Sequence, residues 1–497
     1  MKFMVYIPSS LNSPEFEILL SKSQLILDQK KNLDIIICGG GKDYACANNI
    51  FAQPKICKIC KKNTKKGLDK LKGKYNLLRT PRINKKKYKA PSNLSSSPYK
   101  IKKLNIGNFD IGLSVYSSYI NSSRDHDFQG YLSKYSLNKL YSTSLMLNGF
   151  FKNYITMNKI KKIILYNGRH NHTRVLVRVG QLNKIETEVM EFSGDGESNK
   201  GVRSFYNHLP TDIKYLYYLI MKNWDISSKS NKCDYFFKYK AAGRLIGDKA
   251  SYVLKQKSNL VPINWDYKKR NIVYFTSSQD EYSALGGEYD KTIYKNQTSS
   301  IKMIIKDIKK HNKKKNICFW IRCHPNLEHV FWDYNDSINQ FQDPDNNIFV
   351  IPPASPVSSY KIMRICEKVI TYNSLTGIEA VYWNKPSIVL GRRVYEKLNC
   401  IYSPKSHNSN LKLILNKNLK PKSKNGAIKF ASFWVEGGYR IKYLTGSMRH
   451  GYQFKKESLR LAGMEKWQYY IEKFKQLYLY NYIISFKLSK ILKRFIK

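Results

Sequence analysis

The sequence has few acidic residues for its size and no long hydrophobic run. Asp and Glu together number 36 against 87 Lys and Arg, which gives a formal net charge of +51. Such an excess predicts an anionic partner: a nucleic acid, a phosphorylated substrate or an anionic membrane surface. Lys, Asn, Ile and Tyr are all abundant, however, and this general bias weakens the charge as a sign of nucleic-acid binding.

The chain also lacks a recognisable targeting or membrane-spanning segment. No run reaches the roughly 18 apolar residues of a spanning helix. Residues 1–8 (MKFMVYIP) are too short for a signal-peptide core with its flanks, and we expect a strand there. We therefore expect a cytoplasmic protein whose nine cysteines are mostly reduced, or in part bound to metal. Its 497 residues favour two domains over one.

Two ligand motifs are incomplete near the amino terminus. Glycines 39–41 follow a predicted strand, 34–38, but do not fit G-x-G-x-x-G, so they predict no dinucleotide site. One C-x-x-C pair is present, without the second pair of a zinc ribbon. A structural zinc site is one hypothesis, and redox chemistry or simple buried thiols are the alternatives. The cysteines concerned are Cys38, Cys46, Cys57 and Cys60.

The amino-terminal half begins as an alternating α/β sequence. Predicted strands at 2–7 and 34–38 flank a helix at 15–28, as in a Rossmann-like sheet. A later strand ends in Asn167, Gly168 and Arg169, and the next one carries Glu191 near its end. Ligands of open α/β sheets bind at this carboxyl edge, so Asn167, Arg169 and Glu191 are candidate site residues. Alternatively, Arg169 only pairs with a carboxylate and Glu191 only caps a turn.

From about residue 260 the alternation is regular and predicts a parallel, doubly wound sheet. Predicted strands lie at 272–275, 316–322, 348–351, 369–371 and 387–390. Small and polar residues follow the strand ends and should converge on one edge of the sheet: Ser277, Ser278, His324, Ser355, Asn373, Ser374, Thr376 and Gly391.

Residues 369–395 form the most informative unit of this half. A short strand is followed by a polar turn, a helix that Pro386 ends, and a second strand. Thr376 and Glu379 have the spacing of a capping box. Free backbone N–H groups at the strand-to-helix turn are suited to binding phosphate. An ordinary capped helix is the alternative.

The carboxyl-terminal residues 457–497 are predicted to be helical. Residues 477–497 mix aromatic and aliphatic side chains with Lys and Arg. This pattern suits a helix lying on an anionic membrane leaflet, and a basic surface helix packed on the body is an equal alternative.

Three motifs of the carboxyl half resemble bacterial capsule and surface-polysaccharide biosynthesis proteins. They are FTSSQDE at 275–281, IRCHPN at 321–326 and TYNSLTGIEAVYWNKPSIVLG at 371–391. Related families are the Kdo-type capsule glycosyltransferases and the CDP-glycerol glycerophosphotransferases. YNGR at 166–169, the strand that ends near Glu191 and the cysteine arrangement resemble the amino-terminal half of the same group.

The resemblance implies an α/β fold of the GT-B type, with two Rossmann-like domains facing a cleft. It implies an acceptor domain at 1–258, a nucleotide-sugar domain at 259–454 and a basic helical tail at 455–497. The implied activity is a glycosyltransferase that moves a sugar, or a polyol phosphate, from a nucleotide-activated donor to a surface or capsular glycan or a lipid-linked glycan. Such enzymes usually need no metal for catalysis, and no nucleic-acid partner is expected.

The same resemblance suggests a role for each motif residue. Ser374, Thr376 and Gly377 would meet phosphate, and Glu379 would bind ribose if it is not used in the cap. His324 and Arg322 would approach phosphate from the neighbouring strand, while Glu191 is a candidate for the base that deprotonates the acceptor. The remaining donor-side candidates are Ser277, Ser278 and Asn373.

Two other functions stay open at this point. A sugar-nucleotide 2-epimerase shares the fold and would bind a similar donor, but it needs no acceptor groove. A nucleic-acid-binding protein is suggested only by the net charge, since no recognisable binding module is present and the lysines are spread along the chain.

Overall fold

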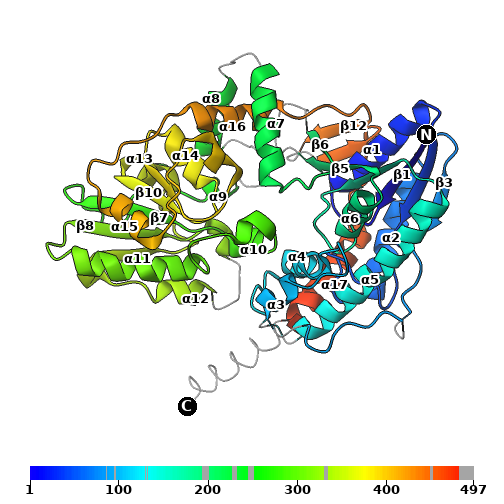
Figure 1. Cartoon of the computed structure of the whole chain (residues 1–497), viewed down its shortest axis with the longest axis horizontal. Coiled ribbons are helices and arrows are strands. Elements are labelled where there is room, and N and C mark those ends of the chain that lie inside the picture. The colour runs from blue at the N-terminus through cyan, green and yellow to red at the C-terminus, as the bar shows by residue number, and fades with distance from the viewer. Residues whose placement is uncertain are drawn as a thin grey trace. The chain divides into compact units, whose positions relative to one another are not determined.

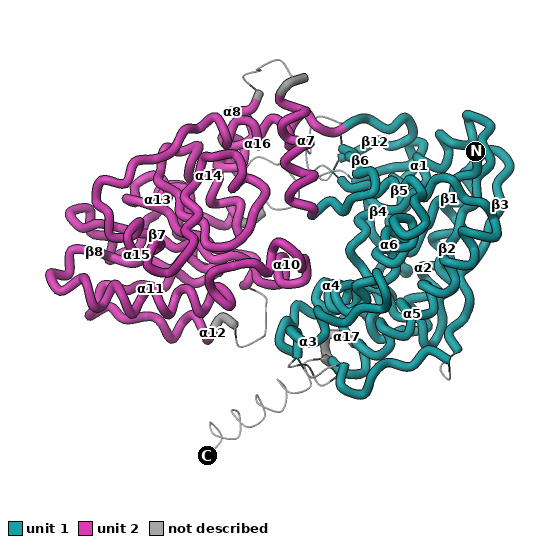
Figure 2. The backbone as a smooth tube through the Cα atoms, in the orientation of Figure 1, with its two compact units in different colours: residues 1–192, 199–211, 439–497 teal, residues 193–198, 212–438 magenta. Residues whose placement is uncertain are grey.

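The computed structural model describes the chain except residues 85–86, 95–96, 129, 131, 193–200, 227–231, 244–250, 329–333, 448–450 and 481–497. The chain forms two compact units (Figure 2). Unit 1 comprises residues 1–192, 199–211 and 439–497, and unit 2 comprises residues 193–198 and 212–438.

Unit 1 is built on a six-stranded sheet in the order β3-β2-β1-β4-β5-β6. Its strands are β1 (Lys2–Ile7), β2 (Asn32–Ile37), β3 (Asn76–Arg79), β4 (Lys162–Tyr166), β5 (Glu186–Phe192) and β6 (Val202–Tyr206). Neighbouring strands are parallel except β5 and β6, which are antiparallel. The central strands are rich in Ile and Val and are buried on both faces, as parallel strands require.

Helices cover both faces of this sheet (Figure 1). The described helices of unit 1 are α1 (Glu15–Asp28), α2 (Pro54–Leu68), α3 (Pro98–Lys102), α4 (Ile111–Ser123), α5 (Ser133–Met157), α6 (Arg174–Leu182) and α17 (Gly463–Tyr480). On one face α1 packs on the strands through Phe16 and Leu20. On the other, Phe151 of α5 meets the Tyr6 ring edge-on at 5.1 Å. A small antiparallel sheet of β12 (Leu444–Ser447), β13 (Gly451–Phe454) and β14 (Glu457–Ser458) packs beside α1.

Unit 2 contains a five-stranded, fully parallel sheet in the order β11-β10-β7-β8-β9. Its strands are β7 (Arg270–Phe275), β8 (Ile317–Arg322), β9 (Ile348–Ile351), β10 (Lys368–Thr371) and β11 (Ser387–Val389). Successive residues of β7 face opposite sides: Ile272 and Tyr274 join one core cluster, and Val273 and Phe275 join the other.

The helices of unit 2 are α7 (Ile213–Ile226), α8 (Lys232–Ala241), α9 (Ser251–Leu254), α10 (Gln279–Tyr282), α11 (Gln297–His311), α12 (Tyr334–Asn339), α13 (Ser359–Ile365), α14 (Thr376–Tyr382), α15 (His407–Leu415) and α16 (Asn425–Glu436). Helices α11 and α15 contribute to the core on one face of the sheet, and α13 and α14 to the core on the other. Figure 1 shows this doubly wound arrangement.

The predicted fold class, α/β with two Rossmann-like sheets, is confirmed. The boundaries of the compact units differ from those of the predicted domains at 1–258, 259–454 and 455–497. Helices α7 and α8 precede residue 259 but pack with α16 in unit 2, and residues 439–454 belong to unit 1. The helix predicted from residue 457 begins at Gly463, after the short strand β14. No helix among the described residues is long and apolar enough to cross a membrane.

Candidate functional site

A pocket of 320 Å³ opens in unit 2 at the carboxyl ends of β7, β8 and β10. The strand order reverses between β7 and β10, and open α/β sheets bind ligands at such a reversal. Most of the predicted donor-side residues line this pocket: Ser277, Ser278, Arg322, His324, Asn373, Ser374, Thr376 and Glu379.

Hydrogen bonds between the strand-end loops hold the pocket in shape. The backbone N–H of Asn373 donates to the Ser277 hydroxyl at 2.8 Å. The backbone N–H of His324 donates to the Thr276 hydroxyl, also at 2.8 Å. These contacts connect the loops that follow β7, β8 and β10 at one edge of the sheet. The floor of the pocket is therefore held by hydrogen bonds between these three loops.

Asn373 has an unusual environment in this pocket. It is only 1% exposed, and neither the oxygen nor the nitrogen of its side-chain amide has a hydrogen-bond partner among the described residues. The nearby Arg393 donates from Nη2 to the Asn373 carbonyl oxygen, and its buried Nε is likewise unpaired within the described chain. Buried polar groups in native proteins are nearly always satisfied, so these atoms can bind a polar group of a ligand or an ordered water.

His324 begins the turn after β8. Its Nδ1 accepts the backbone N–H of Asn326 at 3.1 Å, as an N-cap side chain does. A neutral imidazole whose Nδ1 accepts a hydrogen bond carries its proton on Nε2. In that neutral state, Nε2 of this pocket-lining residue is a hydrogen-bond donor.

Arg322 lines the pocket, but its guanidinium is held by protein groups. It donates to the carbonyl oxygens of Pro352 at 2.6 Å and Ser355 at 3.3 Å, and to the Ser359 hydroxyl at 3.2 Å. Burial lowers the pKa of Arg322 to about 10. It thus adds buried positive charge and fixes the loop after β9.

The turn before α14 differs from its prediction in one respect. Thr376 and Glu379 do not form the expected capping box: α14 begins after Leu375 without a side-chain cap. Glu379 instead accepts hydrogen bonds from Lys240 and from the Tyr360 hydroxyl. The spacing was misleading because Glu379 has closer partners on neighbouring helices than the backbone of its own first turn.

Small side chains occupy the rest of this turn. The hydroxyls of Ser374 and Thr376 lie 2.7 Å apart. Gly377 is not among the pocket-lining residues. A Cβ there would stand 2.9 Å from both the Tyr395 hydroxyl and a Val389 methyl, so Gly377 permits close packing of α14 on the sheet.

The candidate residues of unit 1 also gather at one place. Glu191 accepts a hydrogen bond from Tyr166 at 2.8 Å and from the Asn167 side chain at 2.7 Å. Burial raises the pKa of Glu191. Arg169 follows in the same loop and donates from Nη2 to Asn121 at 3.2 Å.

A second carboxyl group stands near Glu191. Burial raises the pKa of Glu15 to about 8, and the charge of Glu191 adds to the effect. Glu15 begins α1, which sequence reasoning treated only as a structural helix. Glu15 could have been predicted as a site residue, because it lies in the first turn of the helix after β1 and that turn is also at the carboxyl edge of the sheet.

Residues 255–400 match the family model described as capsule polysaccharide biosynthesis protein. This segment contains all three carboxyl-half motifs, so the predicted resemblance is confirmed there. A comparison with curated protein sequences gives no match.

Several solved structures are similar to the chain. KpsC of Thermosulfurimonas dismutans, a beta Kdo 2,4 transferase, is 11% identical with a TM-score of 0.35, over 55% of this chain and 79% of that one. The beta Kdo 2,7 transferase of the same organism's KpsC is 13% identical with a TM-score of 0.31, over 56% and 78%. The UDP-GlcNAc 2-epimerase of Methanocaldococcus jannaschii is 12% identical with a TM-score of 0.27, over 86% and 97%. These likenesses concern the fold alone.

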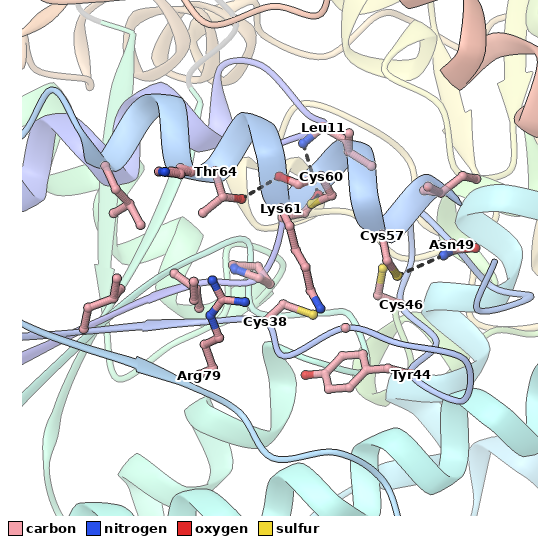
Figure 3. A pocket seen from close by; sticks show the side chains of 18 of the residues that line it. Leu11, Cys38, Tyr44, Cys46, Asn49, Cys57, Cys60, Lys61, Thr64 and Arg79 are labelled. Atoms are coloured by element: carbon pink, nitrogen blue, oxygen red, sulfur yellow. Dashed lines mark hydrogen bonds between the residues drawn. The ribbon is translucent and has the colours of Figure 1, made fainter. Parts of the chain in front are cut away.

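The four amino-terminal cysteines line a separate pocket of 240 Å³ in unit 1 (Figure 3). Figure 3 shows Lys61 and Arg79 reaching into the same space from opposite sides. Burial raises the pKa of the Cys46 thiol to about 12 and also raises that of Cys38, to which the neighbouring thiols contribute. In the part of the chain that the structure describes, no three His, Cys, Asp or Glu side chains are placed to hold a metal ion. The zinc site therefore stays a prediction.

Sequence reasoning missed several residues of the unit 2 pocket. Lys240, Gln256 and Trp434 come from outside the strand-end loops, and Arg393 follows the last strand by a few residues. Of these four residues, only Arg393 could have been predicted from the sequence, because it lies just past Gly391 at the same edge of the sheet.

Proposed function

We propose that this chain is a glycosyltransferase that moves a sugar, or a polyol phosphate, from a nucleotide-activated donor to a surface or capsular polysaccharide. In this proposal unit 2 binds the donor. The observation that carries it is the buried, unpaired amide of Asn373 beside Arg393 in the pocket where the strand order reverses. A buried polar group without a partner costs about 1–3 kcal/mol, and a nucleotide offers both donors and acceptors to offset that cost.

The pocket also suits a phosphate that becomes a leaving group. Arg322 and Arg393 give it positive charge, while the charge of Lys240 is paired with Glu379, and the Ser374 and Thr376 hydroxyls offer donors. Helix α14 spans only seven residues, so the proposal rests on these side chains rather than on the end of the helix. His324 would donate from Nε2 as negative charge develops in the transition state. Ser277 and Ser278 support the donor-binding turn, and no metal is assigned to the chemical step.

Glu191 is proposed to be the general base that deprotonates the acceptor hydroxyl. A general base works best when its pKa lies near the operating pH, and burial shifts Glu191 in that direction. Asn167 and Tyr166 hold the carboxylate in place, and in this proposal Arg169 of the same loop contacts the glycan. The acceptor is proposed to be a growing glycan or a lipid-linked glycan, with the enzyme working on the cytoplasmic side of the membrane.

The test is a nucleotide-release assay on the purified full chain. Nucleotide sugars and CDP-glycerol are supplied with and without an oligosaccharide acceptor, in the presence and absence of a metal chelator. The proposal expects free nucleotide and an extended glycan only when the acceptor is present, with or without chelator. Isomerisation of the sugar nucleotide without acceptor would instead identify a 2-epimerase. Tight nucleic-acid binding that weakens steeply with salt, without transfer, would favour the third alternative.

A further inference from the structure

Helix α17 exposes its large apolar side chains. Met464, Trp467, Ile471 and Phe474 are between 49% and 73% exposed. They are spaced by three, four and three residues, so they lie along one side of the helix. We call these four residues the α17 apolar face; Tyr470, 54% exposed, borders it.

The opposite side of α17 is attached to unit 1 by charge. Glu465 pairs with Lys62 at 2.5 Å and with Lys66 at 2.9 Å, and Glu472 pairs with Lys55 at 3.5 Å, all three lysines being on α2. An ordinary surface helix turns its apolar stripe inward and its charges outward. Helix α17 does the reverse, so its apolar face is directed away from the body of unit 1.

Positive charge borders this face. Lys466 and Lys475 are exposed and flank the apolar residues on the two sides of the helix, and Lys475 also pairs with Glu472 at 3.1 Å. The lysines of α2 that pair with α17 are themselves half-exposed or more, so the surroundings of the helix are strongly basic. Long lysine side chains beside an apolar stripe can extend to the level of lipid phosphates while the stripe enters the acyl region.

We propose that α17 is a docking surface for an anionic lipid bilayer. The α17 apolar face enters the boundary between headgroups and acyl chains, and Lys466 and Lys475 contact the phosphates. An anionic bilayer supplies both an extended apolar layer and a dense negative charge beside it.

This inference does not use the predicted interfacial segment at 477–497. Residues 481–497 lie outside the described residues, as do the side chains of 476–480. It is also independent of the proposed transferase activity, since no residue of α17 lines the unit 2 pocket. Either proposal can fail without the other.

The test is co-sedimentation of the full chain with vesicles of phosphatidylcholine, with or without phosphatidylglycerol. We expect binding to the anionic vesicles. The double variant W467S/F474S should bind them about tenfold more weakly or worse, because two large apolar side chains no longer enter the bilayer. The pair K466Q/K475Q should weaken binding to anionic vesicles and leave the weak binding to neutral vesicles unchanged. Met157→Ser and Ile263→Ser, at exposed apolar positions away from α17, are the matched controls and should bind as the wild type.

Fluorescence reports on insertion directly. Anionic vesicles should shift the emission of the wild type to shorter wavelength, and Trp467→Phe should lose that shift while still sedimenting with the vesicles. Vesicle binding by W467S/F474S equal to that of the wild type would overturn the proposal. So would a wild-type dimer that this variant dissociates without any change in vesicle binding, because the face would then join two copies of the chain.

Discussion

The backbone N–H of Asn373 donates a 2.8 Å hydrogen bond to the hydroxyl of Ser277, which lies 96 residues earlier in the sequence. This bond joins the ends of β10 and β7, the two strands between which the sheet order reverses. The Ser277 hydroxyl therefore serves the fold, whereas the Asn373 side chain has no partner within the described protein. The two residues should respond to substitution in opposite ways.

Ser277→Ala should lower the melting temperature. It leaves the buried Asn373 N–H without its acceptor, at a cost of about 1–3 kcal/mol in the free energy of unfolding. Asn373→Leu keeps the approximate shape and removes two unpaired polar atoms, so it should keep or raise stability. Thermal unfolding of the two variants beside the wild type checks this, and a large loss of stability in Asn373→Leu would mean that its amide is structural.

His324→Ala should slow transfer by roughly 2–4 kcal/mol of activation free energy if Nε2 acts as a donor to the leaving group. The alanine also removes the acceptor of the Asn326 N–H, which is a structural effect. His324→Asn is the matched variant, because an amide oxygen can replace Nδ1 at the turn but nothing replaces Nε2. We expect His324→Asn to melt like the wild type and still to transfer slowly. Full specific activity in a stably folded variant would end the catalytic assignment.

Glu15 predicts a pH dependence of stability. Its pKa is raised to about 8 in the folded chain, above the usual value of about 4.3 in an unfolded one. The folded state therefore holds this proton more tightly, and its stabilising contribution is present below about pH 4 and is lost as the pH rises towards about 8. Between about pH 5 and pH 8.5, the melting temperature of Glu15→Gln should fall less than that of the wild type. Parallel curves for the two proteins would show that Glu15 titrates normally.

The zinc prediction expects one metal ion per chain at Cys38, Cys46, Cys57 and Cys60. Zinc binds thiolates, so loading must displace protons from thiols whose pKa burial has raised, and the affinity should increase with pH. Elemental analysis of protein purified without chelator measures the content, with C57S/C60S as the control that should contain none. Metal-free wild-type protein would leave the four cysteines as packing residues.

The unit 2 site was predictable because parallel strands place their carboxyl ends at one edge. Ser277, His324 and Asn373 could be grouped from strand ends alone. Their side-chain roles could not: the pattern placed Arg322 at the edge, but it gave no sign that Pro352 and Ser355 would accept its guanidinium hydrogens. Lys240 was missed because it reaches the site from a helix that precedes the sheet.

In unit 1 the longest helix was missed. The 25 residues of α5 mix Ser, Thr and Asn with apolar residues, which hides the helical period. Inside the structure, serine and threonine hydroxyls of α5 donate to carbonyl oxygens of their own helix: the Ser144 hydroxyl, for example, donates to the Leu140 carbonyl at 2.9 Å. Helix α5 can therefore bury serine and threonine side chains whose hydroxyls donate within the helix, and the periodicity of hydrophobic residues alone cannot detect that.

The most direct test of the central claim is calorimetric titration of the full chain with CMP, CDP, UDP and GDP, repeated on Asn373→Leu and on Met157→Ser. If unit 2 holds an activated nucleotide, at least one of the four should bind the wild type and Met157→Ser equally and raise their melting temperatures by mass action. The same nucleotide should bind Asn373→Leu at least about tenfold more weakly, the equivalent of about 1.4 kcal/mol. Binding of none of the four, or equal binding to Asn373→Leu, would contradict the account.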